Sequence, residues 1–505
     1  MADVLLIQTT DGFYGRSQMF LPMGLLCISS LLDKEGYRVK IIDMRVDEEW
    51  EKTLLDELKT SSPICIGITV KTGIQILDGL KASKLIKRHN KDIPVVWGGV
   101  HPSFLPEQTI INDNIDFVVQ GEGEYTFYEL VKALQDGKRN FYDIKGLWYK
   151  DNSKPKATPM RELADLDKLP NLPYHLVDIN AYAEGTKYQF EGGMFTLQSS
   201  RGCPFRCTYC YNSNFNRAKW RAMSPERVLE EVKLAVNRYN IKGIGFVDDN
   251  FFINIKRANQ ILELIEKAGL GVKLWFQGVR VDSLHRMSES ELQRLEKLGV
   301  EYLQIGVESG SQKILDFIKK NMRVEQVIEL NKKLGEYTNI KPIYNFMIGF
   351  PTETERDISL TTELFVRLIE DNPKAVLRYI NYLSVYPGTE IYDLALEIGL
   401  KPPSRLEEWG KMHFFDFNKS YPWISEKMQQ RIIRVIYASY GTNRKLGDYF
   451  DSKIKRLLVK IYYPMAKFRL KHNFYYFMPE ARWDMIGKIV KTMMGERKKK
   501  SEKNP

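Results

Sequence analysis

The sequence predicts an α/β protein with two successive parallel-sheet domains and a helical C-terminal region. Apolar runs alternate with amphipathic helical patterns along the first 400 residues, which is typical of parallel sheets covered by helices. Prolines accumulate between residues 146 and 190, where the first alternation stops. A second alternation follows, so the chain is expected to hold two β/α domains joined by a linker.

Residues 1–145 are expected to form a doubly wound, Rossmann-like domain. Its strands are DVLLIQ, YRVKIID, ICIGITV, PVVWGG and IDFVVQ, and its first helix is GLLCISSLLDKEG. Glycine-containing segments follow these strands: TTDGFYG, VKTG, GGVHPS and GEGE. Ligands of such sheets bind at the carboxyl ends of the strands, and glycine lets the backbone approach a ligand closely. This edge is therefore expected to hold a large ligand.

After the linker at 146–190, residues 191–400 are expected to form a partial, TIM-like β/α barrel. Its strands are FTLQSS, KGIGFVDD, VKLWFQG, EYLQIGVES, PIYNFMIGF and VLRYINYLSVYPGT. In such barrels the chemistry lies at the carboxyl ends of the strands, where this sequence places its polar motifs. Residues 401–505 read as a helical, tyrosine-rich region with a basic tail.

Composition excludes several classes of protein. Of 505 residues, 43% are hydrophobic and 12% aromatic, which argues against extensive disorder. Five cysteines in this length do not make a disulfide framework, so a reducing cytoplasm is the expected location. The opening MADVLLIQ shows no signal-peptide pattern, and no apolar run approaches the ~18 residues of a membrane span. We expect a cytoplasmic protein.

Three of the five cysteines fall in the segment RGCPFRCTYC, as Cys203, Cys207 and Cys210. A zinc site would need a fourth ligand, and no histidine has ligand spacing around this loop. A redox disulfide between the last two would leave Cys203 without a role. An iron–sulfur cluster accepts three protein thiolates if its fourth iron binds something else. The spacing favours the cluster over the other two alternatives.

With this motif after the first barrel strand, the sequence resembles the radical S-adenosylmethionine superfamily, whose C-x3-C-x2-C binds a [4Fe–4S] cluster. The resemblance implies that Cys203, Cys207 and Cys210 are the cluster ligands. It also implies that VDDN, with Asp248, Asp249 and Asn250, lies where the family binds the cofactor's ammonium group. The alternative is helix capping by Asn250. The common GGE form of this motif is absent, as is usual in the cobalamin-binding subgroup.

The later barrel strands carry further motifs that resemble the family's S-adenosylmethionine contacts. Arg280 in GVRVD matches the position that holds the cofactor's carboxylate, for which a guanidinium is suited; the alternative is a surface ion pair. Glu308 and Ser309 in GVESGS match the ribose-contacting position. Ile348 and Gly349 in NFMIGFPTET match the adenine-binding strand, where backbone groups make the contacts.

The N-terminal domain resembles that of cobalamin-binding members of this superfamily. GGVHPS and GEGE match recurring loops of this subgroup and supply the expected cofactor contacts Gly98, Gly99, Gly121, Glu122, Gly123 and Glu124. The histidine motif Asp-x-His-x-x-Gly, which binds cobalt in many cobalamin proteins, is absent, so a water or an apolar side chain near TTDGFYG or VKTG is expected below the cobalt. The alternative is a sheet that binds another ligand or none.

The other two cysteines, Cys27 and Cys65, are expected to be buried small apolar residues. Their number argues against a methylthiotransferase, because enzymes of that kind use three N-terminal cysteines for a second cluster.

The resemblance implies the cofactors [4Fe–4S], S-adenosylmethionine and cobalamin, and an electron donor such as flavodoxin or ferredoxin. The expected function is methylation of an unactivated carbon, started by a 5′-deoxyadenosyl radical. Two alternatives stay open: radical cyclisation or rearrangement without methyl transfer, and a cobalamin or redox sensor that turns nothing over.

The formal charge of +11 belongs to the C-terminal segment, where residues 452–505 hold fifteen Lys or Arg and four Asp or Glu. Basic residues there are interleaved with apolar and aromatic ones, as suits the anionic inner face of a membrane. A plain helical cap is the main alternative, and nucleic acid is disfavoured. A membrane contact would favour a hydrophobic small molecule or lipid as substrate.

Overall fold

The structure is a computed structural model that describes residues 2–10, 19–186, 193–412, 420–443, 453–476 and 478. The chain divides into two compact units. Of the described residues, the first unit holds 2–10, 19–272 and 384–412, and the second holds the others.

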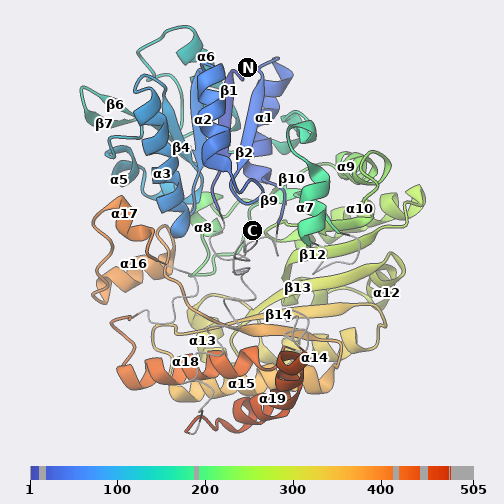
Figure 1. Ribbon diagram of the computed structural model, residues 1–505. Helices are drawn as coiled ribbons and strands as arrows, with labels where there is room; N and C mark the ends of the chain where they lie inside the picture. The colour runs from blue at the N-terminus through green and yellow to red at the C-terminus, as the bar shows by residue number, and fades with distance from the viewer. Residues whose placement is uncertain are drawn as a thin grey trace, which may run out of the picture. The chain divides into compact units, whose positions relative to one another are not determined.

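The first unit begins with a seven-stranded sheet of order β2-β1-β3-β4-β5-β6-β7 (Figure 1). Strands β1 to β5 are parallel, as the sequence predicts, and β6 and β7 add an antiparallel edge. The segment expected as a connector therefore contributes two strands to this sheet. The strands are β1 (Val4–Gln8), β2 (Val39–Asp43), β3 (Cys65–Thr69), β4 (Val95–Gly98), β5 (Phe117–Val119), β6 (Leu147–Asp151) and β7 (Lys154–Ala157).

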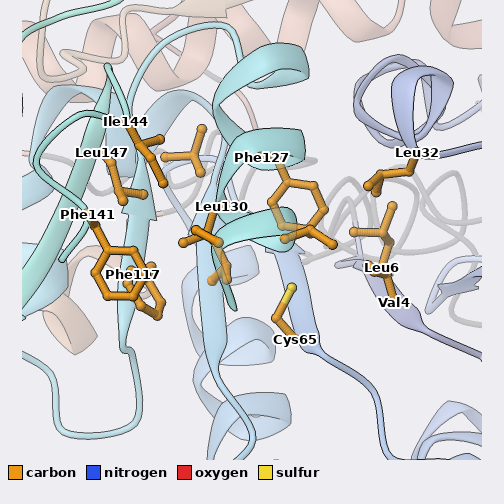
Figure 2. Close-up of a cluster of buried hydrophobic side chains, with 14 of the residues drawn as sticks. Val4, Leu6, Leu32, Cys65, Phe117, Phe127, Leu130, Phe141, Ile144 and Leu147 are labelled. Atoms are coloured by element: carbon orange, nitrogen blue, oxygen red, sulfur yellow. The ribbon is translucent and has the colours of Figure 1, made fainter. Parts of the chain in front are cut away.

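Helices follow each of the five parallel strands. Their bounds are α1 (Met23–Lys34), α2 (Trp50–Thr60), α3 (Ile74–His89), α4 (Val100–Phe104), α5 (Pro106–Ile110) and α6 (Glu124–Gln135). Helices α1 and α6 contact each other and bury apolar side chains in a cluster with β1, β3, β4 and β5. Figure 2 shows Phe127 and Leu130 of α6 in the middle of this cluster. The apolar strands thus find their burial between layers.

Glycine at position 67 makes room for this packing. Its register partner on β1 is Leu6, and a Cβ on Gly67 would lie 2.7 Å from Leu6 Cδ2 and 3.2 Å from Phe127 Cζ. Cys65 lies in the same cluster and is fully buried, which confirms its prediction as a small core residue.

The rest of the first unit contains the cysteine segment and the helices and strands before and after it. The elements are η2 (Leu166–Lys168), η3 (Tyr174–Leu176), α7 (Ile179–Thr186), β8 (Phe195–Leu197), β9 (Ser200–Arg201), α8 (Asn212–Phe215), β10 (Arg221–Ala222), α9 (Pro225–Asn237), β11 (Gly243–Phe246), η4 (Phe251–Ile253), α10 (Ile255–Ala268), α16 (Glu390–Glu397) and α17 (Leu406–Trp409). Strands β8 and β11 pair in parallel, and β9 and β10 form a short antiparallel hairpin.

The second unit contains four parallel strands in sequence order, β12 (Lys273–Arg280), β13 (Val300–Glu308), β14 (Lys341–Ile348) and β15 (Val376–Tyr382). Its helices are α11 (Val281–His285), α12 (Glu289–Lys297), α13 (Gln312–Phe317), α14 (Val324–Gly335), α15 (Glu355–Asp371), α18 (Glu426–Tyr440) and α19 (Lys453–His472). All six strands predicted for the second domain are present. In the described part of the chain, no helix has the length and apolar character to cross a membrane.

Truncating the central aromatic side chain of the first core, Phe127→Ala, is expected to destabilise the protein. Phe127 is 2% exposed, and removing a buried phenyl ring costs about 3–5 kcal/mol through lost burial and the cavity left behind. The urea midpoint of the purified protein should fall accordingly. Ile111→Ala, at an exposed position, is the control and should change stability by less than about 0.5 kcal/mol. Equal midpoints for the two variants would contradict this core assignment.

Candidate functional site

A short hairpin closes the cysteine segment at its base. Strand β9 precedes the first cysteine, and β10 lies opposite it after the last, with Arg201 directly across from Arg221 and Ser200 across from Ala222. Inside the segment, the Cys210 N–H donates to the Cys207 carbonyl at 3.0 Å. Residues 202–220 therefore form one closed loop, called the cysteine loop below.

Gly202 is required where this loop leaves β9. Its φ is +83°, in the left-handed region that glycine favours. A Cβ at this position would lie 2.0 Å from the carbonyl oxygen of Lys219. The two ends of the loop thus approach more closely than any side chain would allow.

The segment after β11 anchors the start of the cysteine loop through two adjacent carboxylates. Asp248 accepts hydrogen bonds from the N–H and hydroxyl of Ser199, at 3.2 and 2.9 Å, and from the Ser200 hydroxyl. Burial raises the pKa of Asp248 to about 6, although the two serines partly offset it. Asp249 accepts from the Gly202 N–H at 2.8 Å. These two residues, expected to contact the cofactor, are used in this structure to position the loop.

Two further carboxylates, from the GEGE segment after β5, bind the base of the hairpin. Glu122 accepts from Arg221 Nη1 and Nη2 at 2.8 and 2.9 Å, from Arg201 Nη1 at 3.1 Å and from the Ala164 N–H at 2.9 Å. Glu124 pairs with Arg201 Nη1 at 2.6 Å. Burial alone would raise the pKa of Glu122, but the two arginines hold it below its usual value.

This buried ion-pair cluster gives the GEGE carboxylates a different set of partners from those expected. The sequence assigns Glu122 and Glu124 to cobalamin, whereas here their charge is compensated by Arg201 and Arg221. Arg201 also donates to Cys27 Sγ at 3.1 Å, so Cys27 is buried as expected but has a polar neighbour.

Unpartnered polar atoms gather in and beside the cysteine loop, which fits a bound polar group. Both side-chain polar atoms of Asn250 are buried and have no hydrogen-bond partner among the described residues, and the same is true of Thr208 Oγ1, Ser213 Oγ and Trp220 Nε1. Buried polar atoms are normally hydrogen bonded. A ligand rich in donors and acceptors, such as the amino and carboxylate groups of S-adenosylmethionine, would satisfy them.

The spacing of the three thiols fits a four-iron cluster. Among the described residues, no group of three or more His, Cys, Asp or Glu side chains is arranged to hold one metal ion. In a four-iron cluster, each thiolate binds a different iron, so the sulfurs need not converge on one point. Burial raises the pKa of Cys210 to about 12, and the Asn212 N–H only partly offsets this shift. A bound metal would lower the pKa of this thiol and favour the thiolate form that binds iron.

In the second unit, a buried polar cluster lies at the carboxyl ends of β12 and β13. Lys320 Nζ donates to Glu308 Oε1 at 2.8 Å, and Arg280 donates from Nη2 to the Lys320 carbonyl at 2.5 Å and from Nε to Asp282 at 2.7 Å. Glu308 has φ +71°, an uncommon conformation for a residue with a side chain that is often found at binding sites. Arg280 and Glu308 are thus brought together, through a lysine that the sequence analysis did not identify.

The remaining predicted contacts of this unit are already engaged within the chain. The Ser309 hydroxyl lies 3.0 Å from Thr361 Oγ1. The Ile348 carbonyl accepts from the Leu383 N–H. Gly349 donates to Glu353 Oε2 at 2.5 Å and accepts from Trp423 Nε1 at 3.1 Å. These groups shape the edge of the sheet, and their expected role in cofactor contact remains a prediction.

At the edge of the first sheet, two of the predicted glycines leave open space beside the backbone. A Cβ on Gly98 or on Gly121 would meet nothing closer than 3.9 Å, whereas one on Gly99 would lie 2.6 Å from the Val70 carbonyl and one on Gly123 3.1 Å from Ile28. Gly98 and Gly121 thus fit a ligand that approaches the backbone, and the other two serve packing. Residues 11–15 of TTDGFYG lie outside the described part of the chain.

A buried histidine follows the Gly98–Gly99 pair. His101 Nδ1 lies 3.0 Å from Thr72 Oγ1, and Trp409 packs edge-on at 5.6 Å. No residue that the structure describes is a hydrogen-bond partner of His101 Nε2. Burial lowers the pKa of the His101 imidazole to about 3, so the ring is neutral at physiological pH.

Sequence reasoning missed Arg201, Arg221, Lys320 and the contact between His101 and Trp409. Arg201 offered the clearest signal, because it stands two residues before the first cysteine of the motif. Lys320 offered none, since it lies twelve residues after its partner Glu308 in a Lys-Lys pair that reads as solvent-exposed.

Neutralising one carboxylate of the buried cluster, Glu122→Gln, is expected to loosen the cysteine loop. An amide cannot balance Arg201 and Arg221, and breaking a buried ion pair by removing one partner costs about 3–5 kcal/mol. Iron bound per chain after anaerobic reconstitution should fall. Asp151→Asn is the control, because it removes an exposed ion pair with Lys156, worth less than about 1 kcal/mol. Equal iron content in both variants would show that the cluster of charges does not hold the loop.

The neutral His101 predicts a pH dependence of stability. Its pKa is lower in the folded chain than the ~6.5 of an unfolded chain, so the unfolded state binds more protons below that pH. The contribution of His101 to the free energy of unfolding is therefore fully present above pH ~6.5 and declines by up to about 1.4 kcal/mol per pH unit below it. Between neutral pH and pH ~5, the thermal midpoint of cluster-free protein should fall less in His101→Gln than in the wild type. Parallel declines would refute the assignment.

Two family models match the chain. The model of the radical SAM superfamily matches residues 197–365, and that of the B12 binding domain matches residues 17–131. The first match spans the cysteine loop and β11 to β14, and the second spans most of the first sheet.

An uncharacterised methyltransferase of Pyrococcus horikoshii is 32% identical over 453 residues, which cover 88% of this chain and 94% of the relative. An anaerobic magnesium-protoporphyrin IX monomethyl ester cyclase of Rubrivivax gelatinosus is 27% identical, covering 68% of this chain and 61% of the relative. Among solved structures, the cobalamin-dependent S-adenosylmethionine radical enzyme OxsB has a TM-score of 0.73 at 21% identity, covering 97% of this chain and 75% of that one, and so shares the fold. The chain belongs to the cobalamin-dependent radical S-adenosylmethionine enzymes, which use a [4Fe–4S] cluster, S-adenosylmethionine and cobalamin.

Proposed function

We propose that the protein is a methyltransferase that methylates an unactivated carbon. One observation carries this proposal: the relative that is similar over nearly the whole of both chains is named a methyltransferase. When bound, the cluster and S-adenosylmethionine together supply a 5′-deoxyadenosyl radical, and cobalamin supplies the methyl group.

We assign the residues of this chain to these groups as follows. Cys203, Cys207 and Cys210 would hold the cluster, because they share one closed loop that leaves polar atoms without partners. Asn250 in the first unit would contact S-adenosylmethionine, since its amide is buried and has no partner within the described ranges. In the second unit, Arg280 and Glu308 keep this role, supported by their joint burial with Lys320 at the carboxyl ends of two adjacent strands.

Gly98 and Gly121 would lie against cobalamin, because both leave open space at the carboxyl ends of neighbouring strands. Glu122 and Glu124 we now propose as positioning residues for the cysteine loop, because arginines compensate their carboxylates. Asp248 and Asp249 have the same role at the start of the cysteine loop, through Ser199, Ser200 and the Gly202 N–H.

Radical cyclisation without methyl transfer is the second candidate. It is favoured by the similarity to the anaerobic cyclase of Rubrivivax gelatinosus, although the similarity covers less of both chains. Both candidates begin with the same radical, so the residues named above would act alike in either. Only the products of the reaction distinguish them.

For the substrate and location, we propose a hydrophobic small molecule or lipid and a cytoplasmic enzyme in peripheral contact with the inner face of a membrane. The support is the concentration of basic, apolar and aromatic residues in the C-terminal segment. A flavodoxin or ferredoxin would supply the electron.

The products formed by reconstituted enzyme with cobalamin, reductant and a lipid extract of the host test the function. Methyl transfer consumes two molecules of S-adenosylmethionine for each methyl group, so S-adenosylhomocysteine and 5′-deoxyadenosine should appear in comparable amounts, both dependent on the extract. Liquid chromatography with mass detection measures both.

Cys207→Ala is the control for that experiment and should give neither product, because the cluster loses a ligand. 5′-Deoxyadenosine that depends on the extract, without S-adenosylhomocysteine, would reject methyl transfer in favour of cyclisation. Unchanged 5′-deoxyadenosine formation by Cys207→Ala would reject the assignment of the cluster ligands.

A further inference from the structure

Helix α19 exposes a stripe of large apolar side chains. Leu457, Ile461, Met465 and Phe468 are 57%, 64%, 47% and 50% exposed. Their spacing of four, four and three residues places them along one face of the helix. Apolar residues scattered singly over a surface are ordinary, whereas four in one row mark an interaction site.

The stripe is not the face by which α19 packs on its own unit. Val459, Ala466 and Leu470 are buried, and helical periodicity places them on the side opposite the stripe. Helix α19 contacts α15 and α18 (Figure 1). Gly441 directly follows α18, and a Cβ at this position would lie 2.4 Å from the Tyr462 ring of α19. The two helices therefore approach closely at this point. The helix therefore has one face buried in the protein and a second apolar face in contact with solvent.

A row of cations runs beside the stripe. Arg456, Lys460 and Lys467 each precede a stripe residue by one position, and Lys471 continues the row. A helix turns 100° per residue, so the basic row and the apolar row lie next to each other along its length. Glu370 of α15 pairs with Lys467 and Lys471, each at 2.9 Å, and so fixes the C-terminal half of the row. Arg456 and Lys460 are exposed at its N-terminal half.

Adjacent apolar and cationic rows fit an anionic lipid surface better than the other occupants. At a bilayer, apolar side chains enter the boundary of the acyl chains while cations meet the headgroup phosphates. A second copy of the helix would bring a like-charged row. Residues 479–505 hold eight Lys or Arg against four Asp or Glu, so this segment is also net positive and would repel the cationic row if it covered the stripe. A nucleic acid would use the cations and leave the stripe in water.

Aromatic residues directly after the helix extend the same surface. Phe474 is exposed and packs against Phe468 with ring centroids 6.2 Å apart, and Tyr476 is almost fully exposed. Aromatic rings with a polar tip are typical of the membrane interface.

We propose that α19 is a docking helix for an anionic membrane surface, with its apolar stripe inserted among the headgroups and its cationic row facing the phosphates. This surface supplies the peripheral contact included in the proposed function and rests on that part of it alone. It does not depend on methyl transfer.

Flotation of the purified full-length chain with lipid vesicles tests the proposal. At low salt, the protein should float with vesicles of phosphatidylglycerol and phosphatidylcholine, and weakly or not at all with phosphatidylcholine alone. The affinity of the double variant Ile461→Gln/Phe468→Gln for the anionic vesicles should fall at least about tenfold, because two apolar side chains no longer contribute the free energy of their burial. Arg456→Gln/Lys460→Gln should show a similar loss and a weaker dependence on salt.

Ile111→Gln/Ile398→Gln, which alters exposed apolar residues of the first unit, is the matched control and should bind as the wild type does. All variants should keep the thermal midpoint of the wild type, since the substituted side chains are exposed. Vesicle binding requires neither cofactors nor substrate, so its outcome is separate from the product measurements.

Three results would overturn the proposal: unchanged binding by the stripe variant, equal flotation with neutral and anionic vesicles, or no flotation together with a dimer that the stripe variant abolishes. Binding to a DNA duplex that only the cation variant loses would instead identify a nucleic-acid surface.

Discussion

The cysteine loop depends on the neutralisation of two arginines by Glu122 and Glu124. Arg201 and Arg221 are direct partners across the β9–β10 hairpin, and like charges facing each other on an antiparallel ladder are destabilising. The hairpin closes because Glu122 accepts from both guanidinium groups and Glu124 pairs with one of them. The cysteine loop, which we propose holds the cluster, is thus stabilised by acids within the segment that matches the B12 binding domain.

The same principle recurs in smaller form at the other polar positions. Asp248 and Asp249 follow β11 and fix the beginning of the cysteine loop. Lys320 donates from its side chain to Glu308 and accepts at its carbonyl from Arg280. In each case a charged side chain is oriented by protein partners before any cofactor arrives. Such preorganisation lowers the cost of binding, because the protein side chains lose less conformational entropy when the ligand binds.

The fold could be predicted almost completely from the sequence, because parallel strands buried on both faces leave long apolar runs that alternate with helices. The hairpin of β6 and β7 was missed, since KPKA with its proline reads as linker and is an edge strand. The cysteines were predicted as cluster ligands from their spacing, their position after the first barrel strand and the motifs on the later strands. The partners of Glu122 could not be predicted, because they depend on which loops lie together at the edge of the sheet. The local sequence does not specify these tertiary contacts. Asp248 and Asp249 were predicted as cofactor contacts, whereas their hydrogen bonds to Ser199, Ser200 and Gly202 follow from tertiary contacts that the local sequence does not reveal.

The ion pairs of Glu122 also constrain how this chain can change by recombination. Residue 122 and residues 201 and 221 lie in segments that match two separate family models, yet their charges balance one another in a buried place. An N-terminal module exchanged as a cassette from a protein without an acid at this position would leave two arginines facing each other in the interior. Glu122 and the two arginines would therefore have to be exchanged together.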